Sequence, residues 1–198
     1  MRVRDFGFVS VRHIAVLGWI VALTVSAAMA QPAQPAATVP PSSVPTERVE
    51  LGDFASDLDG WTYYGGWEFK GAGGKLEHDK TVGRQADGSA RLTGDFSKGG
   101  SYVAMKRACN AAALSVSFWI KAEGLSHFSV RLTDATGQTF QRKVDLAAGG
   151  QWQRVELTDL SKADGYFGGA KDGVWHGPLK AVWIMLTVQT GRGGGTLW

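Results

Sequence analysis

The chain has 198 residues, of which 44% are hydrophobic and 11% aromatic, and its formal net charge is +3. This composition excludes a disordered chain, and a lone cysteine, Cys109, excludes a fold held together by internal disulfides. Outside residues 1–30 the chain carries 18 basic and 17 acidic residues. This near-neutral balance, without a Lys/Arg cluster, disfavours nucleic acid as a partner.

Residues 1–30 have the organisation of a signal peptide. Three arginines lie in the first twelve positions, the run Ile14–Val25 is almost uncharged and apolar, and Ala28-Met29-Ala30 supplies the small residues of a cleavage site. We therefore expect cleavage before Gln31, export to the periplasm or the extracellular space, and no membrane attachment after cleavage. A retained anchor is the alternative, but the strongly apolar part is shorter than the roughly 20 residues that span a bilayer.

Residues 31–48 form a predicted linker. The segment holds five of the six prolines among Ala, Ser, Gln and Thr, so it can bury little apolar area and should act as a semi-extended spacer. The folded domain is therefore expected over residues 49–198.

The predicted domain alternates apolar and polar residues with the period of β-strands, and no segment keeps apolar residues at helical spacing over three turns. The alternation is clearest in residues 89–93, 114–121, 127–133, 153–157 and 181–189. Asp134–Gly137 contains residues that tolerate turn dihedrals, which predicts a hairpin from 127–133 to 138–145. About eight short strands without helices predict an all-β fold, an antiparallel β-sandwich of the jelly-roll kind.

The last four residues, Gly195-Thr196-Leu197-Trp198, have the pattern of the first half of a strand. A strand cut at that point leaves backbone groups of its neighbours unpaired. We therefore expect a truncated last strand and a chain that is a fragment of a longer protein.

Several short segments together form a recognisable pattern. They are Asp53-Phe54, Leu58-Asp59-Gly60-Trp61, Gly88-Ser89, Gly94-Asp95-Phe96, Gly100-Ser101-Tyr102-Val103, Ser117–Lys121, Arg131–Gln141, Gln151–Val155 and Asp172–Pro178. This pattern resembles carbohydrate-binding modules of the galactose-binding-like jelly-roll type, as found N-terminal in bacterial glycoside hydrolases. The resemblance covers about residues 49–198 and implies a polysaccharide or oligosaccharide partner and a catalytic domain beyond Trp198.

The resemblance also bears on cofactors. Many relatives carry an acid where this chain has Ala55, and one carboxylate of their structural calcium site would lie past Trp198. We predict no cofactor, and the sequence gives no support for structural calcium.

The alternation also predicts which side chains point away from the core. If Phe118, Val130 and Leu186 face inward, the neighbouring residues on their strands face outward. From these positions, and from equivalent ones on adjacent segments, we predict one ligand-binding patch formed by Tyr102, Trp119, Arg131, Gln141, Trp183 and Gln189. Aromatic rings stack on the apolar face of a pyranose, and Arg and Gln bond to its hydroxyl groups. Exposed aromatics on a polar sheet face are typical of interaction sites.

The alternative is that Trp119 and Trp183 are packing residues. The ligand site would then lie at the loop edge near Tyr63, Tyr64 and Trp67. We interpret three other tryptophans, Trp61, Trp67 and Trp152, as structural.

The sequence shows no recognisable catalytic motif. It contains neither a Gly-x-Ser-x-Gly elbow nor a His-Glu-x-x-His pair, its acids cluster in turns, and its histidines lack metal-ligand spacing. The leading hypothesis is a non-catalytic carbohydrate-binding module of an exported polysaccharide-acting enzyme. Two alternatives remain, a sandwich that only spaces or docks a glycoside hydrolase domain, and a protein-binding assembly module.

Overall fold

The computed structural model describes residues 9–13, 48–84 and 88–198, with only the backbone described for residues 9–13. Every regular element in these ranges is a β-strand, and all strand pairs are antiparallel. The predicted all-β antiparallel fold is therefore confirmed. The predicted cleavage site and nearly all of the predicted linker lie outside the described residues.

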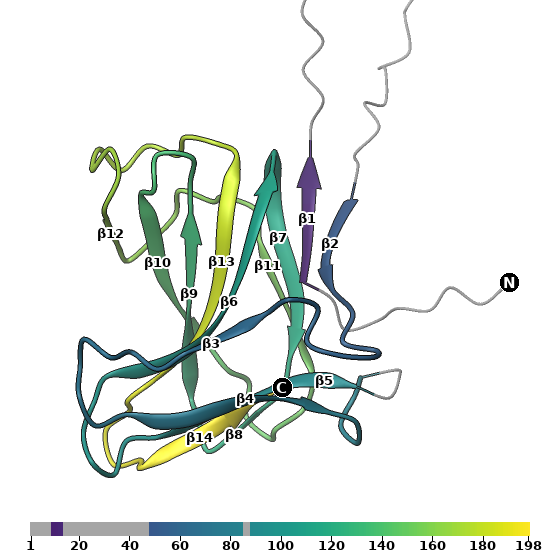
Figure 1. The fold of residues 1–198 in the computed structure, drawn as a ribbon, viewed down its shortest axis with the longest axis vertical. Coiled ribbons are helices and arrows are strands. Elements are labelled where there is room, and N and C mark those ends of the chain that lie inside the picture. The colour runs from purple at the N-terminus through teal and green to yellow at the C-terminus, as the bar shows by residue number, and fades with distance from the viewer. Residues whose placement is uncertain (1–8, 14–47, 85–87) are drawn as a thin grey trace, which may run out of the picture.

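The strands form three sheets (Figure 1). The six-stranded sheet has the spatial order β12 (Gly165–Phe167), β10 (Thr139–Asp145), β9 (His127–Thr133), β13 (Leu179–Thr187), β6 (Tyr102–Ala111) and β3 (Thr62–Tyr64). The β7 sheet has the order β11 (Gln153–Leu157), β7 (Ala113–Ile120), β1 (Val9–His13) and β2 (Arg48–Gly52). The β5 sheet has the order β4 (Gly73–Asp79), β5 (Ser89–Asp95), β14 (Gly194–Leu197) and β8 (Ala122–Glu123).

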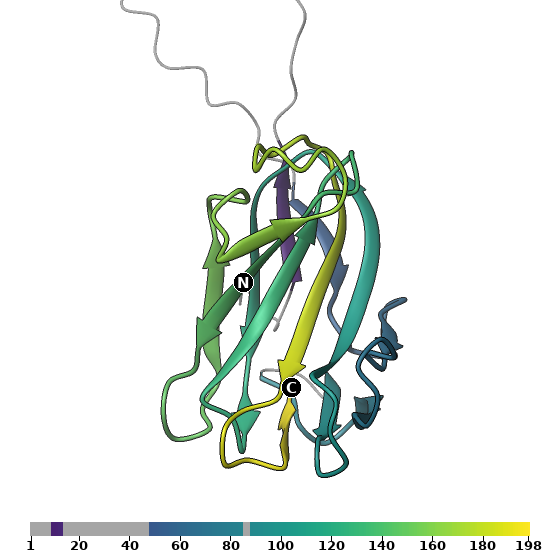
Figure 2. The same cartoon turned by 90° about the vertical axis from the view of Figure 1, so that its left-hand side faces the viewer.

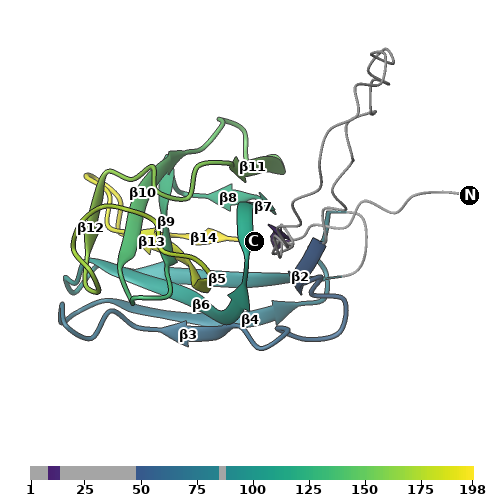
Figure 3. The same ribbon diagram turned by 90° about the horizontal axis from the view of Figure 1, so that it is seen from above.

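The β7 and β5 sheets adjoin, because β8 follows β7 after a single residue, Lys121. Seen from above, β12 and β10 lie at one end of the molecule and β1 and β2 at the other (Figure 3). The longer strands run along the long axis of the molecule (Figure 2).

One hydrophobic core is shared by all three sheets, and it follows the predicted alternation. On β7 the buried apolar residues are Val116, Phe118 and Ile120, on β9 they are Phe128, Val130 and Leu132, and on β13 they include Val182, Ile184 and Leu186. Full burial of each such side chain contributes about 1.5–3 kcal/mol. The alternation is therefore the main reason that these segments fold as strands with one inward and one outward face.

The predicted hairpin joins β9 to β10, and its turn is fixed by one buried carboxylate. Oδ1 of Asp134 accepts hydrogen bonds from the backbone N–H groups of Thr136 and Gln138, and Oδ2 accepts one from the backbone N–H of His176. The side-chain Nε2 of Gln138 also donates to the carbonyl oxygen of Val174 at 2.9 Å. These bonds tie the hairpin turn to the loop that follows β12 and so hold β12 at the edge of the six-stranded sheet.

Strand β1 comes from the segment that the sequence predicts to be a signal peptide. It lies between β2 and β7, with Ser10 opposite both Glu50 and Ser117. The signal peptide remains a prediction. The described residues include no helix that is long and apolar enough to span a bilayer.

Candidate ligand-binding face

The outward face of the six-stranded sheet carries a row of polar and aromatic side chains. Trp183 on β13 lies opposite Lys106 on β6 and Arg131 on β9, and Arg131 lies opposite Gln141 on β10. Residues directly opposite one another on paired strands project from the same face. The sheet therefore brings together Arg131, Gln141 and Trp183, as the sequence predicted.

Next to this row, the same face has a small apolar cluster of its own. Tyr102, Ala104 and Met185 are buried there, and Tyr64 and Trp183 pack against them. The rings of Tyr64 and Tyr102 are stacked with centroids 6.1 Å apart, and Trp183 meets Tyr64 edge-on at 5.3 Å. Tyr102 thus lies on the predicted face but is buried there, 4% exposed, so it supports the face instead of contacting a ligand as the sequence had predicted. Tyr64 extends the face to the loop edge that was the alternative site.

The loop between β3 and β4 folds back over this cluster. At Gly66 the backbone has φ +58°, and a Cβ there would lie 2.3 Å from the carbonyl oxygen of Tyr102, so only glycine allows this approach. The loop presents Trp67 and Phe69 to solvent, 67% and 49% exposed. Because Trp67 is so exposed, the structure does not support its interpretation as a packing residue.

A chain of polar contacts runs from the loop across the face. The hydroxyl of Tyr102 donates to a carboxylate oxygen of Glu68 and accepts from Nη1 of Arg131 at 3.4 Å. Tyr64 also donates to Glu68, at 3.2 Å, and Nε of Arg131 donates to Oε1 of Gln141 at 2.6 Å. Glu68 therefore serves as the common acceptor for two tyrosines, and Arg131 is anchored by two different groups.

The titration behaviour of these groups follows from their contacts. Burial, together with the hydrogen bond to Glu68, raises the pKa of Tyr102 to about 12. The hydrogen bond from Tyr102 in turn lowers the pKa of Glu68. Near neutral pH the pair is therefore a neutral phenol and a carboxylate, which keeps the donor and acceptor roles of the chain fixed.

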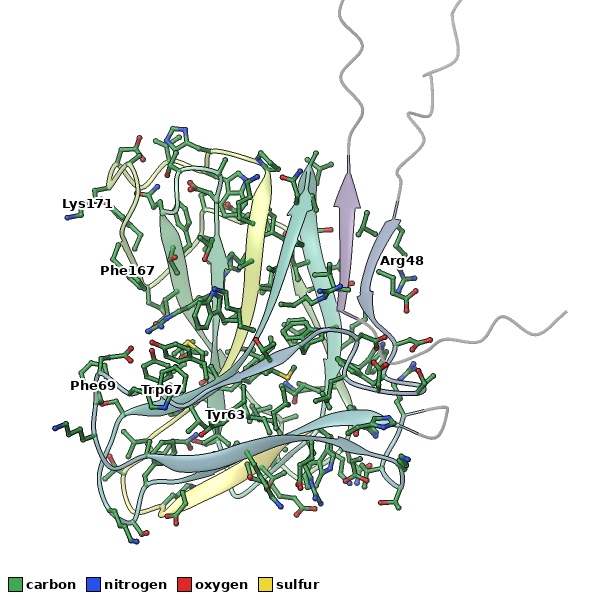
Figure 4. All side chains as sticks on the ribbon, viewed as in Figure 1. Arg48, Tyr63, Trp67, Phe69, Phe167 and Lys171 are labelled. Carbon is green, nitrogen blue, oxygen red and sulfur yellow. The ribbon has the colours of Figure 1, made fainter. Side chains whose placement is uncertain are left out.

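Two aromatic rings also lie close to the guanidinium group of Arg131. Its guanidinium carbon lies 4.8 Å from the ring centroid of Tyr102 and 5.2 Å from that of Phe167. Phe167 is on β12 and is 48% exposed. Figure 4 shows Phe167 above Phe69 and Trp67 on the same side of the molecule. Arg131 therefore lies beside one exposed ring, Phe167, and one buried ring, Tyr102.

Trp183 is more enclosed than the sequence suggested. The ammonium group of Lys106 lies 4.4 Å from the centroid of its ring, and Tyr64 covers its edge. Its Nε1 is buried and has no hydrogen-bond partner among the described residues. The rings best placed for stacking on a ligand are therefore Trp67, Phe69 and Phe167. The sequence predicts only Trp67 among them, and only as part of the alternative site at the loop edge.

The prediction that Trp119 belongs to this face is wrong. Trp119 lies on β7 in a different sheet, opposite Arg154 of β11. The guanidinium carbon of Arg84 lies 3.5 Å from the centroid of its ring. Alternation predicts which side chains of a strand point away from the core, but it does not predict to which sheet the strand belongs.

The prediction that Gln189 is an outward contact is also wrong. Its side chain is 7% exposed; Oε1 accepts from the backbone N–H and the hydroxyl of Ser126, and Nε2 donates to the carbonyl of His127 at 2.7 Å. Strand β13 ends at Thr187, so the alternation does not extend to this residue. Gln189 instead fastens the start of β9.

Within residues 48–84 and 88–198, no group of three or more His, Cys, Asp or Glu side chains is arranged to hold a metal ion. The aspartates near Ala55 accept backbone hydrogen bonds within local turns. Asp59 accepts from the backbone N–H of Phe54 at 2.7 Å, and Asp57 accepts from that of Asp59 at 2.6 Å.

Comparison with protein-family models and with curated proteins found no match. Among solved structures, the chain is similar to a family 11 carbohydrate-binding module from Clostridium thermocellum in complex with a β-1,3-1,4-mixed-linked tetrasaccharide. The TM-score is 0.54 at 16% identity, over 74% of this chain and 89% of that one. A family 11 module of the cellulosomal cellulase Lic26A-Cel5E of the same organism gives a TM-score of 0.51 at 14% identity, over 74% and 88%. The chain thus has the jelly-roll fold of a carbohydrate-binding module.

Proposed function

We propose that the chain is a non-catalytic carbohydrate-binding module that holds a polysaccharide or oligosaccharide on the outward face of its six-stranded sheet. The observation that carries the proposal is the position of Arg131, whose guanidinium group lies near the buried ring of Tyr102 and the exposed ring of Phe167. The exposed rings of Trp67 and Phe69 lie on the same side of the molecule as Phe167. The fold supports it, because one structure of similar fold is a module in complex with a tetrasaccharide.

The chemistry of this face suits a sugar. A pyranose has an apolar face of C–H bonds, on which a rigid aromatic ring can stack with little loss of conformational entropy. Its hydroxyl groups accept hydrogen bonds from the planar donors of a guanidinium group. Because Gln141 and Tyr102 already hold Arg131, little side-chain freedom remains to be lost when a sugar binds.

The sequence supports a wider context for this module. A signal peptide followed by a proline-rich linker is typical of an exported protein whose domains need separation. We therefore place the module in the periplasm or outside the cell, as part of a longer polysaccharide-acting enzyme with its catalytic domain elsewhere. The alternatives from the sequence, a spacer or a protein-binding module of the same fold, would leave this face without a sugar.

Affinity electrophoresis of the chain through gels that contain different soluble polysaccharides tests the proposal. We expect at least one polysaccharide to retard the protein, and the double variant Trp67→Ala/Phe69→Ala to migrate as in a gel without polysaccharide. Trp119→Ala is the matched control, since it removes an indole from another sheet, and should be retarded like the parent chain. Absence of retardation on every polysaccharide would favour the spacer, and loss of retardation in Trp119→Ala alone would move the site to the β7 sheet.

A further inference from the structure

Two cationic side chains lie on either side of Trp183 on the proposed binding face. Trp183 of β13 is opposite Lys106 of β6 and opposite Arg131 of β9. Neighbouring strands are about 4.8 Å apart, so the two cationic side chains leave one face from backbone positions about 10 Å apart. The ammonium group of Lys106 lies over the ring of Trp183, and both cationic side chains are half-buried. The face therefore carries two positive charges with an aromatic ring between them.

Neither of these cations has an acidic partner among the described residues. The ion pairs found there involve neither Lys106 nor Arg131. Arg131 donates from Nε to the amide oxygen of Gln141 and from Nη1 to the hydroxyl of Tyr102, which leaves its Nη2 group without an acceptor in the described part of the chain. The ammonium group of Lys106 contacts the face of an indole, which cannot neutralise its charge. Both cations therefore keep charge and donor groups for a ligand.

The acidic side chains close to this face have other partners. Glu68 accepts hydrogen bonds from two tyrosine hydroxyls and does not pair with Arg131. Asp145 pairs with Lys143 at 3.4 Å, and Asp164 accepts from the backbone N–H of Lys143 at 2.6 Å. The positive charges beside Trp183 are thus left uncompensated by the protein itself.

A ligand that stacks on the exposed rings of this face would remove water from both cations. Covering a charge costs free energy unless the new surroundings supply hydrogen bonds and an opposite charge. The hydroxyl groups of a neutral sugar supply the hydrogen bonds alone. A carboxylate supplies both, and its two oxygens match the planar donors of a guanidinium group. The chemistry of the face therefore favours a sugar that carries a carboxylate.

We propose, as an extension that rests on the proposed function, that this face selects an acidic polysaccharide built from uronate units. Arg131 binds a sugar carboxylate through its remaining donors, and Lys106 supplies a second positive charge across Trp183. Electrostatic complementarity of this kind gives an interface its specificity. Lys106 is thereby assigned to the binding face as a residue that determines specificity.

Isothermal titration calorimetry with matched ligands tests the proposal. Oligosaccharides of polygalacturonate, alginate and glucuronan are each compared with their methyl esters, which keep the sugar backbone and remove the charge. At about 0.15 M salt, attraction beyond about 8 Å is largely screened, so close contacts dominate the comparison. We expect at least one of the three acids to bind, and its methyl ester to bind more weakly by about tenfold or more.

A pair of double variants with equal changes of charge locates the effect. Lys106→Gln/Arg131→Gln should weaken binding of the acid by about tenfold or more. Lys75→Gln/Arg154→Gln is the matched control, since it removes the same charge from strands β4 and β11 of the other two sheets, and should change affinity less than twofold. If the first double variant does not fold, Lys106→Gln alone keeps the contacts of Arg131 and should still weaken binding about threefold.

Equal affinity for an acid and its methyl ester would overturn the proposal. Equal losses in the two double variants would do the same, because they would show attraction to the net charge of the protein. Tighter binding of dextran sulfate than of every uronate would replace the carboxylate by a sulfate ester. Binding of neutral polysaccharides alone would overturn this inference and leave the proposed function intact, whereas binding of no saccharide would overturn both.

Discussion

Two tryptophans of this molecule, Trp119 and Trp183, each have a cationic side chain over the ring, but the groups around the two rings differ. Lys106 covers the ring of Trp183, and Arg84 covers the ring of Trp119. Around Trp183 lie further rings and the polar chain from Glu68 to Arg131, whereas Trp119 lies beside an apolar pocket at the end of β14. The comparison teaches that a cation over an outward tryptophan does not by itself identify a ligand site. Exposed rings on the same side as an anchored hydrogen-bond donor distinguish the first region from the second.

The largest expected difference comes from removing one arginine from each region, Arg131 from the region of Trp183 and Arg84 from the region of Trp119. Arg131→Ala should weaken polysaccharide binding at least tenfold, because a hydrogen bond from a charged group contributes about 1.5–3 kcal/mol. Arg131→Lys, which keeps the charge but loses the planar donors, should recover only part of the affinity. Arg84→Ala is the matched control and should change affinity less than twofold in isothermal titration calorimetry. Equal losses in Arg131→Ala and Arg84→Ala would contradict the assignment of the site.

A second test separates the exposed rings from the enclosed one. Trp67→Ala should weaken binding about three- to tenfold and leave the melting temperature nearly unchanged, since 67% of that side chain is exposed. Trp183→Ala should lower both affinity and melting temperature, because its ring packs against the cluster around Tyr102. If Trp183→Ala unfolds the protein, Trp183→Phe keeps a ring in the cluster and allows the affinity to be measured. A large loss of stability in Trp67→Ala would show that its ring is a packing residue.

The sequence predicted the strands better than it predicted the site, and the reason is physical. Period-two alternation reports burial within one strand, so β7, β9 and β13 could be predicted, together with the hairpin of β9 and β10. Sheet membership depends on contacts between distant segments, and for that reason Trp119 was placed on the wrong face. Gln189 was misplaced because alternation loses its meaning past the end of a strand.

The loop that completes the site was predicted only as the alternative site, through Trp67, and its residues Glu68 and Phe69 were missed. Residues 65–71 read Gly-Gly-Trp-Glu-Phe-Lys-Gly, so two aromatic residues flank an acid between glycines. Large rings in such a glycine-bounded segment have few neighbours to cover them, which is a signal that they are exposed. That Glu68 reaches Tyr102 could not be predicted, because it depends on the close approach of Gly66 to the backbone of Tyr102.

A third test concerns the polar chain that distinguishes the first region. Glu68→Gln should lower the pKa of Tyr102 from about 12, because the hydrogen bond to a carboxylate no longer holds the phenol proton. The pKa should stay above 10.0, since burial is the larger cause of the increase. Ultraviolet absorbance during alkaline titration measures this change, and the difference from Tyr102→Phe identifies the signal of that tyrosine. An unchanged titration in Glu68→Gln would show that the contact is absent in solution.

The smallest expected effect concerns Asp172, which lies in the loop that follows β12, close in sequence to Phe167. The backbone N–H of Val174 and the imidazole of His176 donate to the carboxylate of Asp172 and lower its pKa from 3.8 to about 2. A carboxyl group with a lower pKa in the folded state stabilises the protein above the unfolded value, and this contribution disappears as pH falls from about 4 toward 2. Urea unfolding from pH 5 to pH 2.5 should therefore show a smaller loss of stability in Asp172→Asn than in the parent chain. Asp145→Asn, which removes an exposed carboxylate that pairs with Lys143, is the control and should follow the parent chain. If Asp172→Asn loses stability with falling pH as steeply as the parent chain, the contacts of Asp172 do not stabilise the loop beside the proposed binding face.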